Sequence, residues 1–331
     1  MKLKLIMKKV FISLISLAML YSCSDNESSL LEKGLSNDIK VHATVEKMTV
    51  VKSVISSDNV NGVNFLRVDQ ATNSVAPSDF GSATTPLTGN MVNGNINFLG
   101  TTPEYLHNNY YAYMVAYWPA GTMANKNITW DIDGKTDILL SNVWCAGNYT
   151  NPIENGMVFE HQLSRLQVIC KAQAGVALEA VQDTWGQITS IEIVGVKPQL
   201  QLNTTNEAVI STGNAQNAAL LQSDYNTAFE PIAIPASGNT TINAATMQAP
   251  IALSNEYYSL QLLVKTTKKP EGVTINVALK SNTDTKIMSF DAGKINTVTL
   301  TFKSTDKVIE VSSTTITPWA EGYIASNDVV I

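Results

Sequence analysis

The segment IKVHATV (residues 39–45) alternates apolar and polar side chains with a period of two. Such alternation places one set of side chains in a core and the other set in water, as in a half-buried β-strand. The same pattern recurs near the C-terminus, where threonines separate Val298, Leu300 and Phe302. Further runs rich in β-branched and aromatic residues are separated by turn sequences and lie at 110–118, 188–196, 257–266 and 273–279. The sequence therefore predicts an all-β protein with two antiparallel β-sandwich domains in tandem.

The composition agrees with this prediction and excludes one large class of partner. The chain has 331 residues, a formal net charge of −6 and only 15% charged residues, against about 25% in an ordinary soluble protein. Its polar surface must come from other residues, and the sequence contains 30 asparagines. Because no cluster of Lys and Arg is available to neutralise phosphates, we expect no nucleic-acid partner.

The N-terminus has the pattern of a lipoprotein signal peptide over residues 1–22. Four lysines within the first nine residues precede an eleven-residue apolar run, Val10 to Leu20, which is shorter than the about 20 residues that a membrane-spanning helix needs. The run ends in LYSC (20–23), which resembles a lipobox, so we expect Cys23 to become the lipid-modified N-terminus. The alternative is an ordinary signal peptide in which Cys23 is incidental. Residues 23–37 are polar and are expected to form a tether.

The mature chain is long enough for two cores, and a change in composition marks the expected division between them. Around residues 172–187 an apolar run ends and a new strand pattern begins. We therefore expect an N-terminal β-sandwich over residues 38–178 and a C-terminal β-sandwich over residues 179–331.

The stretch YYAYMVAYW (110–118) is apolar on both faces of the predicted strand. This pattern is typical of a central strand that is buried on both sides. The alternative is an exposed row of aromatic rings on which carbohydrate stacks.

The histidines give no sign of an active site. His42, His107 and His161 belong to no motif that combines a nucleophile, a base and an orienting group. His161 shares a predicted strand face with Phe159 and Leu163, which favours a hydrogen-bonded histidine of the core. We do not expect an enzyme.

Two other groups of residues leave alternatives open. The run 131–137 carries three aspartates but lacks the remaining ligands of a calcium loop, and a hairpin turn at Asp133–Gly134 explains the same residues. Cys145 and Cys170 either form a disulfide in an oxidising compartment or remain two buried free thiols. We expect no metal and no cofactor.

Four stretches of the sequence, taken in order, share motifs with a known family. They are the lipobox with its tether and the strand 39–45, then Asp137 to Leu140 with VFEHQLSRLQVI (158–169), then the strands 188–196 and 257–266, and finally AGKINTVTLTFKSTDKVIEVSSTTITPWAEG (292–322). In the second stretch the alternation changes phase between Leu163 and Leu166, which predicts a β-bulge near Ser164–Arg165. Together the stretches resemble the fimbrillin family, the pilin subunits of Bacteroidetes-type fimbriae, and the last one places Ile316, Trp319 and Gly322 at the family's terminal spacing.

The resemblance implies a structural pilus subunit with two transthyretin-like domains, supporting cell adhesion. It implies export as a lipoprotein, a lipid (palmitate) anchor in the outer membrane, and assembly with other fimbrial subunits into a homo- or hetero-polymer at the cell surface. Host or bacterial surface ligands are further partners that it suggests. The short acidic segment SDNE (24–27) resembles the signal that sends such lipoproteins to the outer face of the outer membrane.

The resemblance also implies that a protease cutting after Arg or Lys removes the first strand, and that a strand from a neighbouring subunit takes its place. Candidate cleavage sites are Lys47, Lys52 and Arg67. The other interpretation of the chain is a surface-exposed glycan-binding lipoprotein. The exchanged strand would carry the inward set Ile39, Val41, Ala43 and Val45.

Overall fold

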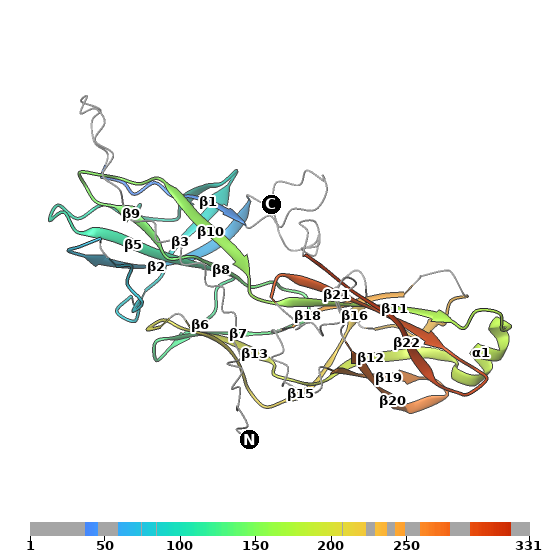
Figure 1. The fold of residues 1–331 in the computed structure, drawn as a ribbon. Coiled ribbons are helices and arrows are strands. Elements are labelled where there is room, and N and C mark those ends of the chain that lie inside the picture. Colours follow the sequence, from blue (N-terminus) through green and yellow to red (C-terminus); the bar gives the residue numbers. More distant parts are fainter. Residues whose placement is uncertain are drawn as a thin grey trace, which may run out of the picture. The chain divides into compact units, whose positions relative to one another are not determined.

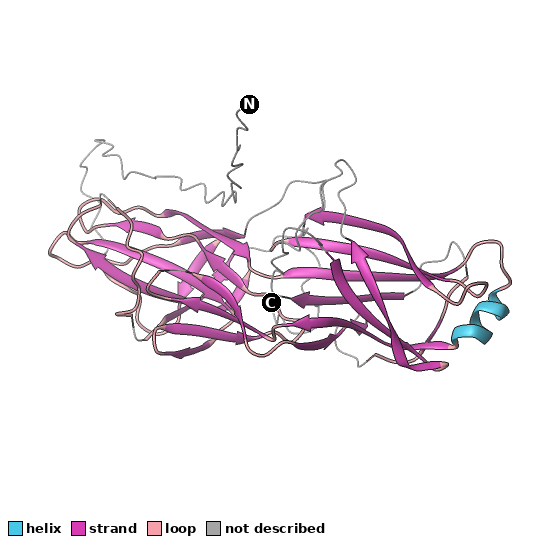
Figure 2. Cartoon of the chain, turned by 60° about the horizontal axis from the view of Figure 1, so that its bottom comes forward, coloured by secondary structure: helices cyan, strands magenta, loops and turns pink. Residues whose placement is uncertain are grey.

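The computed structural model describes nine stretches of the chain. Cys23, Lys47, Lys52, Trp319 and Gly322, which the sequence singles out, lie outside the described residues. Within them, strands dominate and one α-helix occurs, α1 (Leu178–Trp185) (Figure 2). The stretches are residues 37–45, 59–73, 75–83, 85–206, 208–222, 229–236, 242–248, 259–278 and 292–318.

A ring of seven strands forms the first half of the fold (Figure 1). The hydrogen-bonded order is β2-β3-β4-β1-β10-β8-β5, and pairing of β2 with β5 closes the ring. An eighth strand, β9 (Trp144–Gly147), pairs with β5. The ring strands are β1 (His42–Val45), β2 (Val60–Gln70), β3 (Leu87–Val92), β4 (Asn95–Phe98), β5 (Tyr111–Trp118), β8 (Leu139–Ser141) and β10 (Asn155–His161).

The turn between β3 and β4 shows how local sequence shapes the ring. Asn93 and Gly94 adopt φ angles of 48° and 76°, the left-handed conformation that both central residues of a type I′ hairpin require. Asparagine and glycine tolerate this conformation better than other residues. A tight turn therefore forms at this dipeptide, and it fixes the register of β3 against β4.

A four-stranded sheet joins segments that are far apart in the sequence. Its order is β14-β13-β7-β6, and the central pair joins Leu202 of β13 to Ile128 of β7. Its strands are β6 (Thr122–Ala124), β7 (Asn127–Asp131), β13 (Gln199–Asn203) and β14 (Val209–Thr212).

Two further sheets enclose a second core. One has the order β16-β18-β11-β21-β22, and the other has the order β15-β12-β19-β20 with β17 paired to β12. Val181 and Trp185 of α1 are buried in the same core. The strands are β11 (Ser164–Ala172), β12 (Gln187–Val196), β15 (Gln216–Ala219), β16 (Leu221–Gln222), β17 (Ile232–Ala233), β18 (Ile242–Gln248), β19 (Ser259–Thr266), β20 (Lys269–Ala278), β21 (Lys294–Phe302) and β22 (Ile309–Pro318).

The all-β prediction is confirmed, whereas the prediction of two transthyretin-like antiparallel sandwiches in tandem is not confirmed. The first half closes into a ring through β2 and β5, and two strand pairs, β1 with β10 and β11 with β21, are parallel. The β-bulge expected near Ser164–Arg165 is instead a break between two strands: β10 ends at His161 and β11 begins at Ser164 in another sheet. Because the two strands face different cores, the alternation changes phase there.

The domain boundary after residue 178 stays a prediction. Two features of the sheets cross this boundary. Leu166 and Val168 of β11 are buried in the second core although they precede that boundary. The hairpin β13–β14 follows the boundary but pairs with β7. A change in composition cannot report such non-local pairing.

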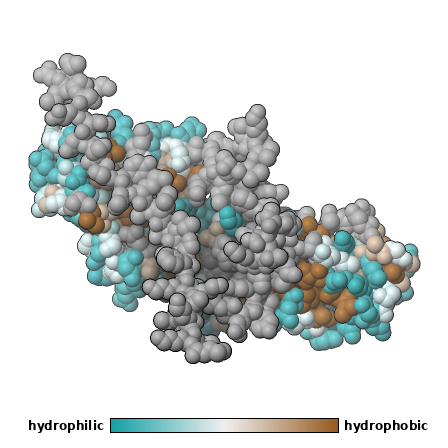
Figure 3. All heavy atoms as spheres, in the orientation of Figure 1, coloured by the Kyte–Doolittle hydropathy of each residue, from teal (hydrophilic) through white to brown (hydrophobic). Residues whose placement is uncertain are grey.

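Burial agrees with the faces predicted from the sequence. Phe159, Leu163, Leu166 and Val168 are all at most 1% exposed. On the face shown in Figure 3, hydrophobic side chains gather over the part of the molecule that contains β20 and β22. Val273 of β20 and Val311 of β22 are only partly buried. No helix among the described residues is long and apolar enough to cross a membrane.

Candidate functional site

The candidate site is the place that β1 occupies in the ring. β1 lies between β4 and β10, whereas β2, the next strand along the sequence, is separated from it by β3 and β4. No hairpin therefore ties β1 to either of its neighbours in the sheet. Its removal would open the ring between β4 and β10 without breaking a tight turn.

Backbone hydrogen bonds hold β1 and the residues before it on both sides. The Ala43 N–H donates to the Gly94 carbonyl at 2.8 Å, and the Val41 carbonyl accepts from the Ile96 N–H at 3.0 Å. On the other side, the His42 N–H donates to the Glu154 carbonyl at 2.9 Å, where the parallel ladder with β10 begins. An incoming strand must supply equivalent donors and acceptors.

Residues 37–39 add a second attachment that the sequence did not reveal. The Ile39 N–H donates to the Pro103 carbonyl, and the Tyr105 N–H donates to the Asn37 carbonyl, both at 2.8 Å. These bonds surround an isolated antiparallel bridge between Asp38 and Glu104. Segment 103–105 has no strand pattern, so only the folded structure shows this contact.

The inward set of this segment is buried as predicted. These side chains are between 1% and 3% exposed and belong to the core of the ring, whereas Thr44 between them is exposed. Burying one Val or Ile side chain is worth about 1.5–3 kcal/mol. Apolar burial therefore contributes strongly to holding the segment in place. The inward residues are Ile39, Val41, Ala43 and Val45.

Among the three candidate cleavage sites, the structure describes only Arg67. It lies within β2, where it is paired with Met114 of β5. Its guanidinium forms an ion pair with Asp69, with 2.8 Å between Nη2 and Oδ1. A residue held inside a sheet is a poor protease substrate while that sheet is intact.

The predicted core histidine has a buried acidic partner. Nδ1 of His161 lies 2.5 Å from Oδ2 of Asp137, whose side chain is 1% exposed. The two residues come from β10 and from the loop before β8. This pair agrees with a structural role for His161.

The aspartates of the run 131–137 turn to different partners. Asp133 accepts hydrogen bonds from the backbone of Lys135 and Thr136, and Asp131 accepts one from the Gln199 side chain. Asp137 pairs with His161. Within the described part of the chain, no three Asp, Glu, His or Cys residues gather as metal ligands would.

Cys145 and Cys170 are not joined by a disulfide, and they contribute to different cores. Cys145 packs against the cluster that contains Tyr113, whereas Cys170 is a buried member of the second core. Burial raises the pKa of the Cys170 thiol from 9.0 to about 12. Of the two alternatives, this outcome favours unbridged thiols, but only Cys170 is buried, because Cys145 keeps part of its surface exposed.

The aromatic strand β5 is buried on both faces, as the first interpretation of its sequence predicts. Tyr113 and Tyr117 are 3% and 2% exposed, and Met114 and Ala116 face the core of the ring. These rings cannot serve as a platform for carbohydrate. A glycan-binding function therefore finds no support in β5.

The strand order and the separate cores define an all-β architecture that is also found in candidate cell adhesion proteins of known structure. A candidate cell adhesion protein of Bacteroides uniformis is 17% identical, with a TM-score of 0.55 over 86% of this chain and 100% of the other. A second one, from Bacteroides ovatus, is 13% identical, with a TM-score of 0.53 over 86% and 98% of the two chains. At these identities the likeness shows the fold alone.

The sequence itself identifies the family. The model of the fimbrillin-like family matches residues 68–319, most of the chain. This protein belongs to that family, and the resemblance inferred from its motifs is confirmed. The match begins within β2 and does not include β1. Among curated proteins none matches.

Proposed function

We propose that this protein is a fimbrial subunit that assembles at the cell surface by exchange of β1, in support of adhesion. Family membership supports the fimbrial role. The observation that carries the exchange is the position of β1, which closes a ring between two strands to which no hairpin connects it. The protein acts as a structural component in this proposal, not as an enzyme.

Exchange follows from ordinary β-sheet chemistry. Departure of β1 leaves unpaired backbone groups on β4 and β10 and uncovers the apolar core beside Met157 and Phe159. A strand from a neighbouring subunit restores both the hydrogen bonds and the burial, which is β-augmentation. Partners are thus other fimbrial subunits, of this chain or a related one.

Release of β1 requires a cut between β1 and β2. Lys47 and Lys52 lie in this connection, and we propose cleavage after one of them. Arg67 is less suitable because its cleavage would also remove most of β2, which pairs with both β3 and β5.

Export and anchoring complete the proposal. Residues 1–22 would be removed, Cys23 would carry lipid such as palmitate, and residues 23–37 would tether the subunit to the outer membrane. Support comes from the basic, apolar and LYSC segments of the sequence. Mass spectrometry of the membrane-extracted protein tests this part, and an unmodified Cys23 would contradict it.

Limited trypsin digestion of the purified, delipidated protein tests the exchange. We expect oligomers in size-exclusion chromatography only after the cut, and we expect an excess of a synthetic 37–45 peptide to suppress them. The variant Lys47→Ala/Lys52→Ala should resist the cut and stay monomeric. The matched control Lys135→Ala/Lys268→Ala, which changes two exposed lysines elsewhere, should behave as the parent. A chain that is cut in this connection and remains monomeric would contradict the proposal.

A further inference from the structure

The interior face of β2 changes from apolar to charged as the strand approaches one end of the ring. Phe65, Arg67 and Asp69 alternate along β2 and therefore share a face. Phe65 is fully buried in the core of the ring. Arg67 and Asp69 follow it and pair with Met114 and Ala112 of β5, which belong to the same core. The two charged side chains thus stand above the core at the mouth of the ring.

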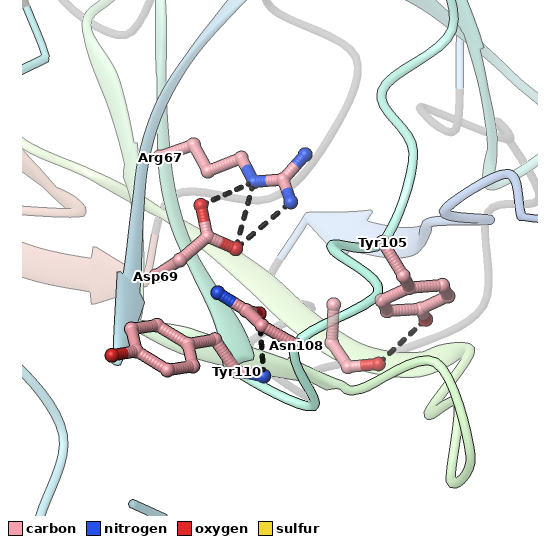
Figure 4. A network of polar contacts seen from close by, with 6 residues as sticks. Arg67, Asp69, Tyr105, Asn108 and Tyr110 are labelled. Atoms are coloured by element: carbon pink, nitrogen blue, oxygen red, sulfur yellow. Dashed lines mark hydrogen bonds and ion pairs between the residues drawn. The ribbon is translucent and has the colours of Figure 1, made fainter. Parts of the chain in front are cut away.

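Arg67 and Asp69 are positioned as one unit (Figure 4). Nε of Arg67 donates to Oδ2 of Asp69 at 3.0 Å, and Nη2 donates to Oδ1 at 2.8 Å. The side chains keep 16% and 20% of their surface exposed. An ionised carboxylate has about four acceptor sites, so Asp69 can accept further hydrogen bonds from a ligand.

A pocket of about 520 Å³ opens beside this pair. Phe65 and Leu87 form apolar parts of its lining, and the hydroxyl-bearing Thr85 and Thr102 and the carboxylate of Glu104 contribute polar parts. Its size falls within the range of small-molecule sites, and barrel mouths are a recurrent place for such sites. Its charged lining residues, Arg67, Asp69 and Glu104, carry a net charge of −1.

We propose that this pocket binds one neutral saccharide unit. Carboxylates accept hydrogen bonds from sugar hydroxyls, a guanidinium donates to hydroxyl or ring oxygens, and an apolar surface accommodates the C–H face of a pyranose. The net negative charge disfavours acidic sugars. This inference deepens the adhesion role of the proposed function, because it names a ligand class and a site for it.

One wall of the pocket is linked to the exchangeable segment. Thr102, Pro103 and Glu104 line the pocket, and the Pro103 carbonyl accepts from the Ile39 N–H. Residues 37–39 therefore hold this wall in place. The uncut chain, in which the wall is attached, is the form in which the pocket should be tested.

The test is saturation-transfer NMR on the uncut monomer with the methyl glycosides of mannose, galactose, fucose and N-acetylglucosamine, and with N-acetylneuraminic acid as an acidic probe. We expect at least one neutral glycoside to bind and the acidic sugar not to bind. Asp69→Asn keeps the shape of the side chain but removes its charge, and should weaken binding about tenfold or more. Asp183→Asn, an exposed aspartate on α1, is the matched control and should leave binding unchanged.

A second variant keeps the test decisive if Asp69→Asn destabilises the fold. Glu104 is exposed, so Glu104→Gln should fold normally and should still weaken binding of the same glycoside. Three results would each overturn the inference. They are no binding of any neutral sugar, binding of the acidic sugar alone, and unchanged binding in both Glu104→Gln and a folded Asp69→Asn. Because the monomer is used, a chain that polymerises but binds no sugar defeats this inference alone. A chain that binds sugar but never polymerises defeats the exchange proposal alone.

Discussion

Val45 of β1 and Phe159 of β10 are partners in a parallel ladder, and both side chains are buried in the core of the ring. Parallel neighbours cannot be joined by a tight hairpin. Val45 is held in the sheet by pairing and packing, because no tight turn joins β1 to β10. The chain continues from Val45 through the segment that leads to β2. One cut in this segment therefore separates β1 from all the later strands of the described residues.

The packing of this segment predicts a stability effect at Val41. Val41→Ala removes two buried methyl groups and should lower the free energy of unfolding by about 2–3 kcal/mol. Thr44→Ala, at the exposed position next to Val45 on the opposite face of the strand, is the matched control and should cost less than about 1 kcal/mol. Urea unfolding of the uncut chain measures both. Equal effects of the two substitutions would show that the inward set does not anchor the segment.

The sequence predicts faces much better than it predicts neighbours. Alternation identified the buried set Ile39, Val41, Ala43 and Val45, and the apolar run of β5 indicated a strand buried on both faces. These predictions depend on local periodicity, which the structure preserves. The pairing of β13 with β7 and the parallel contact of β1 with β10 depend on partners more than 60 residues away, and alternation does not encode a partner.

The candidate sites illustrate the same limit. Arg67 looked like a cleavage site because a basic residue is visible in the sequence, whereas its pairing within β2 and its bond to Asp69 are not. The attachment of Ile39 to Pro103 likewise joins a strand to a segment without strand pattern. The Arg67–Asp69 ion pair has one local sign in the sequence: two opposite charges lie two residues apart in a strand and so share a face.

Burial of Tyr117 predicts a pH dependence of stability. Desolvation raises the pKa of this phenol from 10.0 to about 12. The unfolded chain therefore loses the proton first, so the contribution of this group is complete below about pH 10 and is lost as the pH rises towards 12. Tyr117→Phe should reduce the alkaline loss of stability by roughly 3 kcal/mol, whereas the control Tyr110→Phe, at an exposed tyrosine, should not. Urea unfolding as a function of pH measures this difference. An equal loss of unfolding free energy at alkaline pH in all three proteins would contradict the burial of Tyr117.

The two unbridged thiols should differ in reactivity. Cys170 is fully buried with a raised pKa, whereas Cys145 is partly exposed. Because the thiolate is the reactive form, the native protein should label with a maleimide at Cys145 and only on unfolding at Cys170. Mass spectrometry of the labelled protein, with Cys145→Ser as control, measures this difference. Recovery of a peptide in which the two residues are joined by a disulfide would contradict the structure.

A reversible covalent lock between β1 and β10 tests strand exchange most directly. Thr44 and Val158 are partners in the parallel ladder, and neighbouring strands lie at a spacing that a disulfide spans. In Thr44→Cys/Val158→Cys, oxidation should hold the strand in place after trypsin has cut the connection to β2. We predict that the oxidised, cut protein stays monomeric and that the same sample forms oligomers once it is reduced, while the cut Thr44→Cys single variant forms them in both conditions. Oligomers that appear equally with the lock closed would contradict the exchange of β1.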